Sequence, residues 1–257
     1  MFVEYLTRGV KAGLVAGAVF GVLLALVANP IVGFADELGH EHGEHGHEDG
    51  SHGHEETTAA HDDAGLSVNR GVSVLSGVLW GVLLGAVGFG VAFYFLEPIV
   101  PGTGAVRSYV FAAAGFLTAS GAPWLVLPPA PPGTAHALDV QTRMILYGVM
   151  MAAGAAAAIA GMVLYDRLRG DRGRAVAVAV GLLPVGALPV LAAAVPADRT
   201  TVALPSELAA GLVGLVVFGQ ALMWLVLATV HARLHGAEAG DTAAPTDSRS
   251  GHAVGGD

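Results

Sequence analysis

The sequence contains no cysteine, which excludes disulfide bonds and thiolate metal sites. Any transition-metal chemistry must therefore use His, Asp, Glu, Met or backbone oxygen. Charge is also scarce, because only 13% of the 257 residues are charged, about half the share of a soluble domain. Apolar residues make up 54% of the chain and gather in long blocks. So few charges could not cover the surface of a soluble protein of this size, and the composition predicts an integral membrane protein.

Enzymatic signatures are missing as well. The chain has no Walker-type phosphate loop, no Gly-x-Ser-x-Gly elbow and no His-Glu-x-x-His motif. We therefore expect no enzymatic activity and no permanently bound cofactor. Much of the formal net charge of −9 belongs to residues 36–63 and to the acidic tail, so it describes local segments and not a global field. No nucleic-acid partner is expected.

Six apolar stretches are long enough to cross a bilayer, for which a helix needs about 20 residues. We therefore expect an all-α, polytopic membrane protein with about six transmembrane helices. The first span lies within residues 1–34 and precedes a disordered, His- and acid-rich loop at 35–70. A membrane domain at 71–235 holds five further spans, and residues 236–257 form a disordered polar tail. The five spans cover residues 71–96, 108–127, 144–165, 175–195 (with kinks at Pro184 and Pro189) and 205–230.

The basic residues suggest how these spans are oriented. With a cytoplasmic N-terminus and six alternating spans, nine basic residues fall inside and three outside, as the positive-inside rule requires. Both termini are then cytoplasmic in the plasma membrane, and the histidine-rich loop is extracellular. The inside residues are Arg8, Lys11, Arg107, Arg167, Arg169, Arg172, Arg174, Arg233 and Arg249, and the outside residues are Arg70, Arg143 and Arg199.

The first span has an alternative interpretation as a secretory signal sequence, because residues 32–35 end in the small residue Ala35. Its apolar stretch exceeds the usual signal core of about 7–15 residues, and Phe34 suits a cleavage site poorly, so we prefer a retained span. Glycines recur every four residues in this span and in the next. This spacing places them on one helix face and favours close approach of two backbones. They are Gly13, Gly17 and Gly21, and then Gly77, Gly81 and Gly85.

Seven of the eleven histidines fall within 22 residues of the loop, at His40, His42, His45, His47, His52, His54 and His61. Imidazole binds divalent Zn, Ni, Cu and Co well, and carboxylates such as Asp36 and Glu37 add hard oxygen ligands. Glycine-containing spacers separate the His-x-His pairs, so the loop can wrap around an ion without imposing one geometry. We expect a collector of metal ions with little selectivity. The alternative is a solvated linker with incidental metal affinity.

Polar groups at membrane depth are costly in lipid and tend to be functional. Asn29, Glu97, Gln220 and Asp139 are the candidate path residues on this ground or by their position next to a span. Each also has a structural interpretation, because Glu97 can mark the interface and Gln220 can hydrogen-bond a neighbouring helix. His231 and His235 lie one helical turn apart and could face one ion, but we interpret them as interfacial.

Several weak motifs follow one another in a distinctive order. An acidic Ala-Asp-Glu at residues 35–37 closes the first span and leads into the histidine-rich loop, and a glycine-rich span comes next. The last span begins with proline and carries Phe218 and Trp224. Between them stand Gly115-Phe116, Gly121-Ala122-Pro123, the loop LPPAPPG at 127–133 and the segment ALDVQTR at 137–143.

In this order the chain resembles the CbtA-type probable cobalt transporter subunits, over nearly its whole length up to about residue 235. The resemblance implies the polytopic fold, Co²⁺ as the transported or buffered ion, and a small one-span partner of the CbtB type in the bilayer. The family loop typically reads PPE-x-PG, and here Ala130 replaces the acidic residue. If that carboxylate guides an ion, Asp139 or the histidine-rich loop must take its place.

The leading hypothesis is thus a membrane subunit of a divalent metal transporter, for cobalt uptake linked to cobalamin synthesis. The extracellular histidines and acids would capture the ion and pass it through Asn29, Asp36 and Glu37 to a path between helices. One alternative is an exporter of Ni, Co or Zn, and another is a membrane-anchored metal-binding scaffold. Histidine spacing alone does not select cobalt over nickel or zinc.

Overall fold

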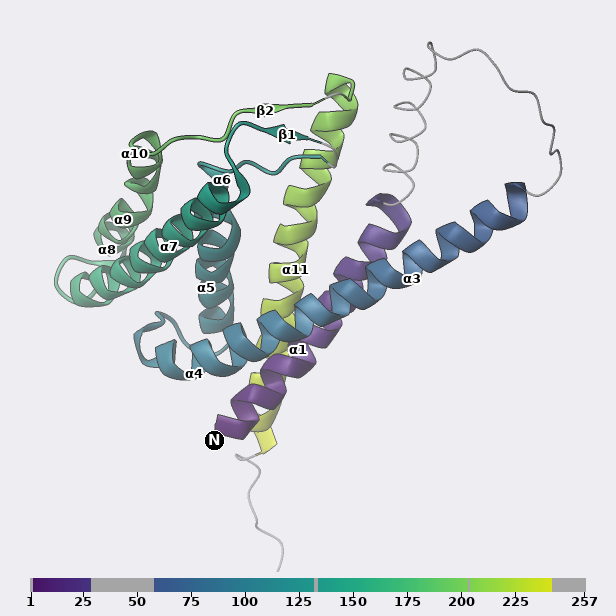
Figure 1. Ribbon diagram of the computed structural model, residues 1–257. Coiled ribbons are helices and arrows are strands. Elements are labelled where there is room, and N and C mark those ends of the chain that lie inside the picture. The colour runs from purple at the N-terminus through teal and green to yellow at the C-terminus, as the bar shows by residue number, and fades with distance from the viewer. Residues whose placement is uncertain (1, 29–57, 132–133, 203, 242–257) are drawn as a thin grey trace, which may run out of the picture.

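The computed structural model describes residues 2–28, 58–131, 134–202 and 204–241, with the side chains of 58–70 and 237–241 left aside. The described chain is helical apart from one short pair of strands (Figure 1). The first half contains α1 (Phe2–Leu23), η1 (Leu24–Ala28), α3 (Thr58–Leu84), η2 (Gly85–Ala92), α4 (Phe93–Leu96), η3 (Glu97–Ile99), α5 (Ala105–Phe116), η4 (Leu117–Gly121) and α6 (Ala122–Trp124). The second contains β1 (Ala135–His136), α7 (Val140–Leu168), α8 (Arg174–Gly181), α9 (Leu183–Gly186), α10 (Leu188–Ala193), β2 (Thr200–Thr201) and α11 (Ser206–Asp241).

Five helical runs in the described residues are long and apolar enough to cross a membrane. The all-α, polytopic fold predicted from hydropathy is thereby confirmed. A further helical run, from α5 through η4 to α6, covers residues 105–124 and is about 30 Å long, the thickness of a hydrocarbon core. The five runs are Phe2–Val27, Gly71–Ile99, Val140–Leu168, Arg174–Ala193 and Ser206–Gly236.

The two ends of the bundle show that the α5–α6 run is also a crossing. Arg8, near the start of α1, donates a hydrogen bond from Nη1 to Nδ1 of His235, near the end of α11, at 3.0 Å. The start of the first helix and the end of the last therefore lie on one side of the membrane, which requires an even number of crossings. We call this the terminal side, and the opposite side, where β1 and β2 pair, the strand side.

Glycine determines how α1 packs against α3 and η2. An added Cβ at any of seven glycines, Gly21 included, would come closer than 3.0 Å to the backbone of the facing helix, so the two backbones are in direct contact. This confirms the close approach predicted from glycines spaced by four. The facing pairs are Gly9 with Gly85, Gly13 with Gly81, and Gly17 with Gly77, in antiparallel order.

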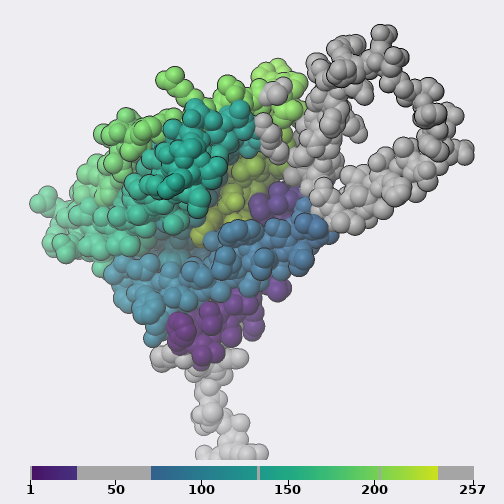
Figure 2. Space-filling model, in the orientation of Figure 1, coloured from purple at the N-terminus to yellow at the C-terminus, as the bar shows by residue number. Residues whose placement is uncertain are grey.

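The last helix, α11, packs against both α1 and α5 and so joins the two halves of the bundle (Figure 1). The main apolar core lies where these helices meet η2, α4 and α7. Away from this core, the helices expose large apolar side chains, as expected where lipid replaces water as the solvent. α3 crosses the visible face of the molecule (Figure 2), and its exposed side chains include Leu75, Leu79 and Trp80.

Three segment boundaries differ in informative ways from those expected. Helix α3 starts at Thr58, inside the segment predicted as loop, although its apolar part starts at Gly71 as predicted. Helix α11 continues to Asp241, into the predicted tail. In both cases the helix continues beyond its apolar span into polar residues, and hydropathy alone does not predict such polar extensions. The span at 174–193 breaks into α8, α9 and α10, with Pro184 and Pro189 in the first turns of the last two, because proline lacks the N–H that would continue the helix.

Candidate ion path between α5 and α11

A line of polar side chains runs between the antiparallel helices α5–η4 and α11. Ser120 Oγ donates to Gln220 Oε1 at 3.4 Å, nearer the strand side. Ser108 Oγ lies 2.9 Å from His231 Nδ1, nearer the terminal side. Trp224 lies on α11 between these two pairs. We call these five residues the α5–α11 seam. One further polar pair between these helices, Tyr109 Oη with Thr229 Oγ1 at 3.2 Å, is exposed. In a bundle that is largely apolar at this depth, a buried polar line is a candidate path for an ion.

His231 and its partner Ser108 are fully enclosed, with none of their surface exposed. The rings of Phe89 and Phe93 each lie 4.8 Å from the imidazole, centroid to centroid. Nδ1 is engaged with Ser108, whereas Nε2 has no hydrogen-bond partner among the described residues. His231 is thus enclosed by protein and not exposed at the surface of the bundle. A buried polar nitrogen without a partner is rare in folded proteins and calls for a functional or structural reason.

Trp224 of α11 packs against Gly115 of α5, which accounts for a glycine and a tryptophan at these two positions. A Cβ on Gly115 would lie closer than 3.0 Å to the Trp224 ring, so the absence of a side chain on α5 makes room for the indole of α11. Trp224 is buried, and its Nε1–H has no partner among the described residues. The seam therefore holds two buried ring nitrogens, on Trp224 and His231, that described protein groups leave unsatisfied.

Charged and phenolic groups close the seam on the terminal side. Arg8 can only donate, so Nδ1 of His235 accepts its hydrogen bond and the His235 proton sits on Nε2. Tyr5 donates to Glu97 Oε2, and Arg107 Nη1 binds Glu97 Oε1 at 3.1 Å. Both carboxylate oxygens of Glu97 are thus engaged, and an ion at this point would have to displace one of these partners.

Asp198 organises the strand side. Its Oδ2 lies 2.6 Å from His136 Nδ1 and 3.5 Å from Arg143 Nε, and its Oδ1 accepts from the backbone N–H of Leu138 at 3.1 Å. Its own N–H donates to the carbonyl of Val126 at 3.1 Å. Asp198 therefore ties the end of the α6 helix, strand β1 and the first turn of α7 to the segment before β2.

The electrostatics of this side favour the ionised forms of Asp198 and Asp139. Burial alone would raise the pKa of Asp198, but the hydrogen bonds from His136 and Leu138, with the charges of His136 and Arg143, lower it overall. Asp139 caps the N-terminus of α7 by accepting from the Thr142 side chain and backbone N–H, and these bonds lower its pKa. Asp139 is thus a helix cap.

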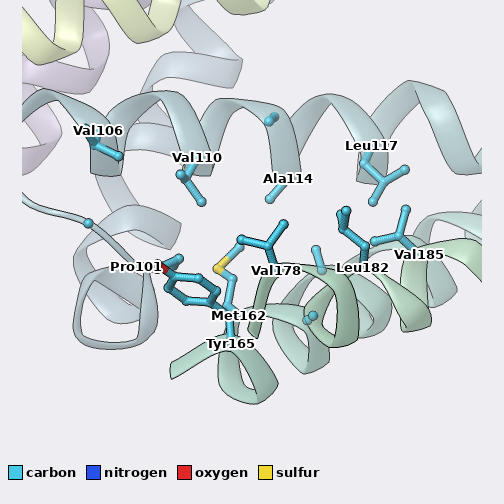
Figure 3. A pocket seen from close by; sticks show the side chains of 15 residues that line it. Pro101, Val106, Val110, Ala114, Leu117, Met162, Tyr165, Val178, Leu182 and Val185 are labelled. Atoms are coloured by element: carbon cyan, nitrogen blue, oxygen red, sulfur yellow. The ribbon is translucent and has the colours of Figure 1, made fainter. Parts of the chain in front are cut away.

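A hollow of about 480 Å³ lies elsewhere, between α5, α7 and α8 (Figure 3). Val110, Leu117, Met162 and Leu182 are typical of its lining, which is apolar apart from Tyr165 at one end. A hydrated or partly dehydrated cation needs oxygen or nitrogen ligands. This hollow is therefore a poor place for an ion, and the seam is the better candidate.

The residues predicted for metal capture fall mostly outside the described residues. His61 lies in the first turns of α3, where the helix is described without its side chains. Among residues with described side chains, no group of three His, Asp or Glu side chains could hold a metal ion. The predicted residues outside the described ranges are Asn29, Asp36, Glu37, His40, His42, His45, His47, His52 and His54.

Sequence reasoning missed Asp198, His136, Ser108 and Trp224 as site residues. A signal existed for Asp198, which is the only acidic residue between the fifth and sixth spans. His136 is one of only four histidines outside the loop, three residues before Asp139. No comparable signal marks Ser108, because an isolated serine in an apolar helix is common and its partner is more than a hundred residues away.

Comparison with known proteins agrees with this architecture. A family model described as "Probable cobalt transporter subunit (CbtA)" matches residues 2–236. No curated protein and no solved structure matches the chain. The matched range includes every described span and the whole α5–α11 seam. The family is one of transporter subunits and not of enzymes, and its ion is cargo and not a cofactor. The chain thus belongs to the CbtA family of probable cobalt transporter subunits and is a multi-pass membrane protein.

Proposed function

We propose that this chain is the membrane subunit through which Co²⁺ enters the cell, in support of cobalamin synthesis. The single observation that carries the proposal is a line of polar side chains through an otherwise apolar bundle, in a chain that belongs to a family of probable cobalt transporter subunits. A divalent cation in a bilayer requires groups that replace part of its hydration shell. Gln220 and His231 offer an amide oxygen and an imidazole at membrane depth.

The orientation in this proposal follows from charge. In the six-span topology expected from the sequence, nine basic residues belong to the segments of the terminal side and three to those of the strand side, and the positive-inside rule then favours a cytoplasmic terminal side and an extracellular strand side. The histidine-rich segment at residues 40–61 then lies outside the cell, where it collects metal at low concentration. Asn29, Asp36 and Glu37 follow as the first groups toward the bundle.

The terminal side favours release of the ion over retention. Arg107 and Tyr5 already engage the two oxygens of Glu97, and the guanidinium of Arg8 lies over the Tyr5 ring. A divalent cation that passes His231 would meet the fixed positive charges of these two arginines and gain little by staying. The proposed sequence is capture outside, brief coordination in the seam, and release past the arginines. A small one-span subunit of the CbtB type completes the transporter.

The test is cobalt and nickel accumulation in cells with and without the gene, under metal limitation. Uptake predicts lower cobalt content on deletion, restored by this chain together with its partner. Higher content after deletion would instead indicate export. Absence of flux in reconstituted vesicles, with the partner present, would indicate a scaffold.

The histidine-rich loop is tested separately by replacing the seven histidines of residues 40–61 with asparagine in the full chain. We expect uptake to fall severalfold at low cobalt and to be unchanged at high cobalt, because a collector only raises the local ion concentration. Loss of uptake at every cobalt concentration would show that the loop belongs to the path.

A further inference from the structure

His136 and Asp198 form a close pair on the strand side, and its geometry determines which nitrogen of the imidazole carries the proton. The contact from Nδ1 to Oδ2 is 2.6 Å, and the Asp198 side chain is only 2% exposed, whereas His136 is 22% exposed. An ionised carboxylate carries no proton, so Nδ1 of His136 must be the donor. In the neutral imidazole, the lone pair then sits on Nε2.

This arrangement is the one in which proteins hold metal-binding imidazoles. A carboxylate on one ring nitrogen fixes the tautomer and the ring orientation and makes the other nitrogen a better ligand. Asp198 is itself fixed by the N–H of Leu138, by Arg143 and by its own N–H to Val126. Nε2 of His136 has no hydrogen-bond partner among the described residues, and the ring reaches the surface.

A purely structural role explains this geometry less well. Asp198 would retain the hydrogen bond from Leu138 and the charge of Arg143 without His136. His136 also belongs to β1, which is already joined to β2 by strand pairing and by the bond from Ala137 N to Arg199 O at 3.0 Å. The carboxylate and the strand therefore both have other support.

The position of the pair relates it to the path. Since successive spans alternate sides, α1 and η1 end, and α3 begins, on the same side of the membrane as β1 and β2. The β2 strand ends five residues before α11 begins, and α11 carries Gln220, Trp224 and His231. In the proposed orientation, His136 therefore stands on the side of the membrane where the ion arrives.

We propose that Nε2 of His136, oriented by Asp198, is a transient ligand for Co²⁺ between the histidine-rich loop and the α5–α11 seam. The inference rests on the proposed transport of a divalent metal ion. One imidazole with water completing the coordination binds weakly, and Arg143 nearby weakens it further. Weak binding suits a residue that passes an ion on.

The decisive variant is His136→Asn, compared with His136→Ala. The asparagine amide can donate to Asp198 from near the position of Nδ1, but it has no group in the position of Nε2. We expect His136→Asn to melt within about 2 °C of the wild type while the KM for cobalt uptake rises on the order of tenfold and the maximal rate is unchanged. If His136→Asn transports as the wild type does and His136→Ala alone is impaired, the role is structural and the proposal is wrong.

A binding measurement separates this inference from the transport proposal. In the full chain in lipid nanodiscs with isotope-labelled histidine, the His136 ring signal is assigned by its loss in His136→Asn. We expect Co²⁺, which is paramagnetic, to broaden this signal at concentrations that leave buried His231 sharp. Asp198→Asn should require about tenfold more Co²⁺ for the same broadening. A His136 signal that stays sharp while the loop histidines broaden overturns the inference, whether or not the protein transports cobalt.

Discussion

The α1–α3 contact and the α5–α11 seam are both formed by antiparallel helix pairs, but glycines form the first and polar side chains the second. In the first, glycines bring two backbones into direct contact. In the second, Ser108, Gln220, Trp224 and His231 place polar groups in an apolar bundle. Close packing of small residues is how lipid-embedded helices gain stability, whereas buried polar groups give little of it. The comparison indicates that the first pair holds the fold, and it agrees with our proposal that the second serves transport.

The largest effect is expected from breaking the glycine contact with Gly81→Val. Its Cβ would overlap the backbone at Gly13 and Gly17, so the helices must separate. We expect a loss of about 3 kcal/mol or of the folded protein altogether, measured by thermal unfolding in detergent. The matched control is Gly88→Val, which lies further along the same helical run and has open space around its added Cβ. Equal damage from both variants would contradict the assignment.

An intermediate effect is expected from making the seam apolar with the double variant Ser108→Ala/His231→Phe. Replacing both partners of a buried hydrogen bond leaves no polar atom of that pair unsatisfied, so the melting temperature should change little. A phenyl ring also fits beside Phe89 and Phe93. Cobalt uptake at saturating metal should nevertheless fall by about tenfold or more, because the imidazole is lost. A variant that is stable and fully active would show that the seam is not the path.

The smallest effect concerns pH at the strand side, where the charge of Asp198 holds segments together as the glycines do between α1 and α3. The pKa of Asp198 is lowered in the folded state. Its stabilising contribution is therefore present above the unfolded-state pKa of about 3.9 and lost as pH falls through the lower, folded-state value. We expect the difference in melting temperature between wild type and Asp198→Asn to shrink below about pH 4. A difference that grows on acidification would show that another group is responsible.

The helical fold could be predicted from sequence because the length and hydropathy of each apolar stretch are enough to predict a transmembrane helix. Hydropathy located the span at Gly71, and proline predicted the breaks at Pro184 and Pro189, from local chemistry alone. The glycine spacing also predicted backbone contact, since glycines such as Gly13 and Gly81 on one helix face allow another helix to approach closely.

The site was harder to predict because its pairs are distant in the chain and individually ordinary. Ser108 and His231 acquire meaning only when α5 and α11 lie antiparallel, and hydropathy says nothing about which helices are neighbours. Glu97 and Gln220 were found because they are conspicuous in apolar surroundings. Asp198 was missed because an acid in a short loop is common, and its partners come from three other segments.

The order of α11 in the chain has a consequence for biogenesis. The first two spans contain all the glycines of their contact, so this hairpin can associate in the bilayer before the segments that follow it are made. The seam needs α11, which is synthesised after the other described helices and docks against both α1 and α5. A chain interrupted before Ser206 would thus insert and begin to pack without three of the five seam residues. If the seam is the ion path, as we propose, the bilayer stays sealed to ions until α11 docks.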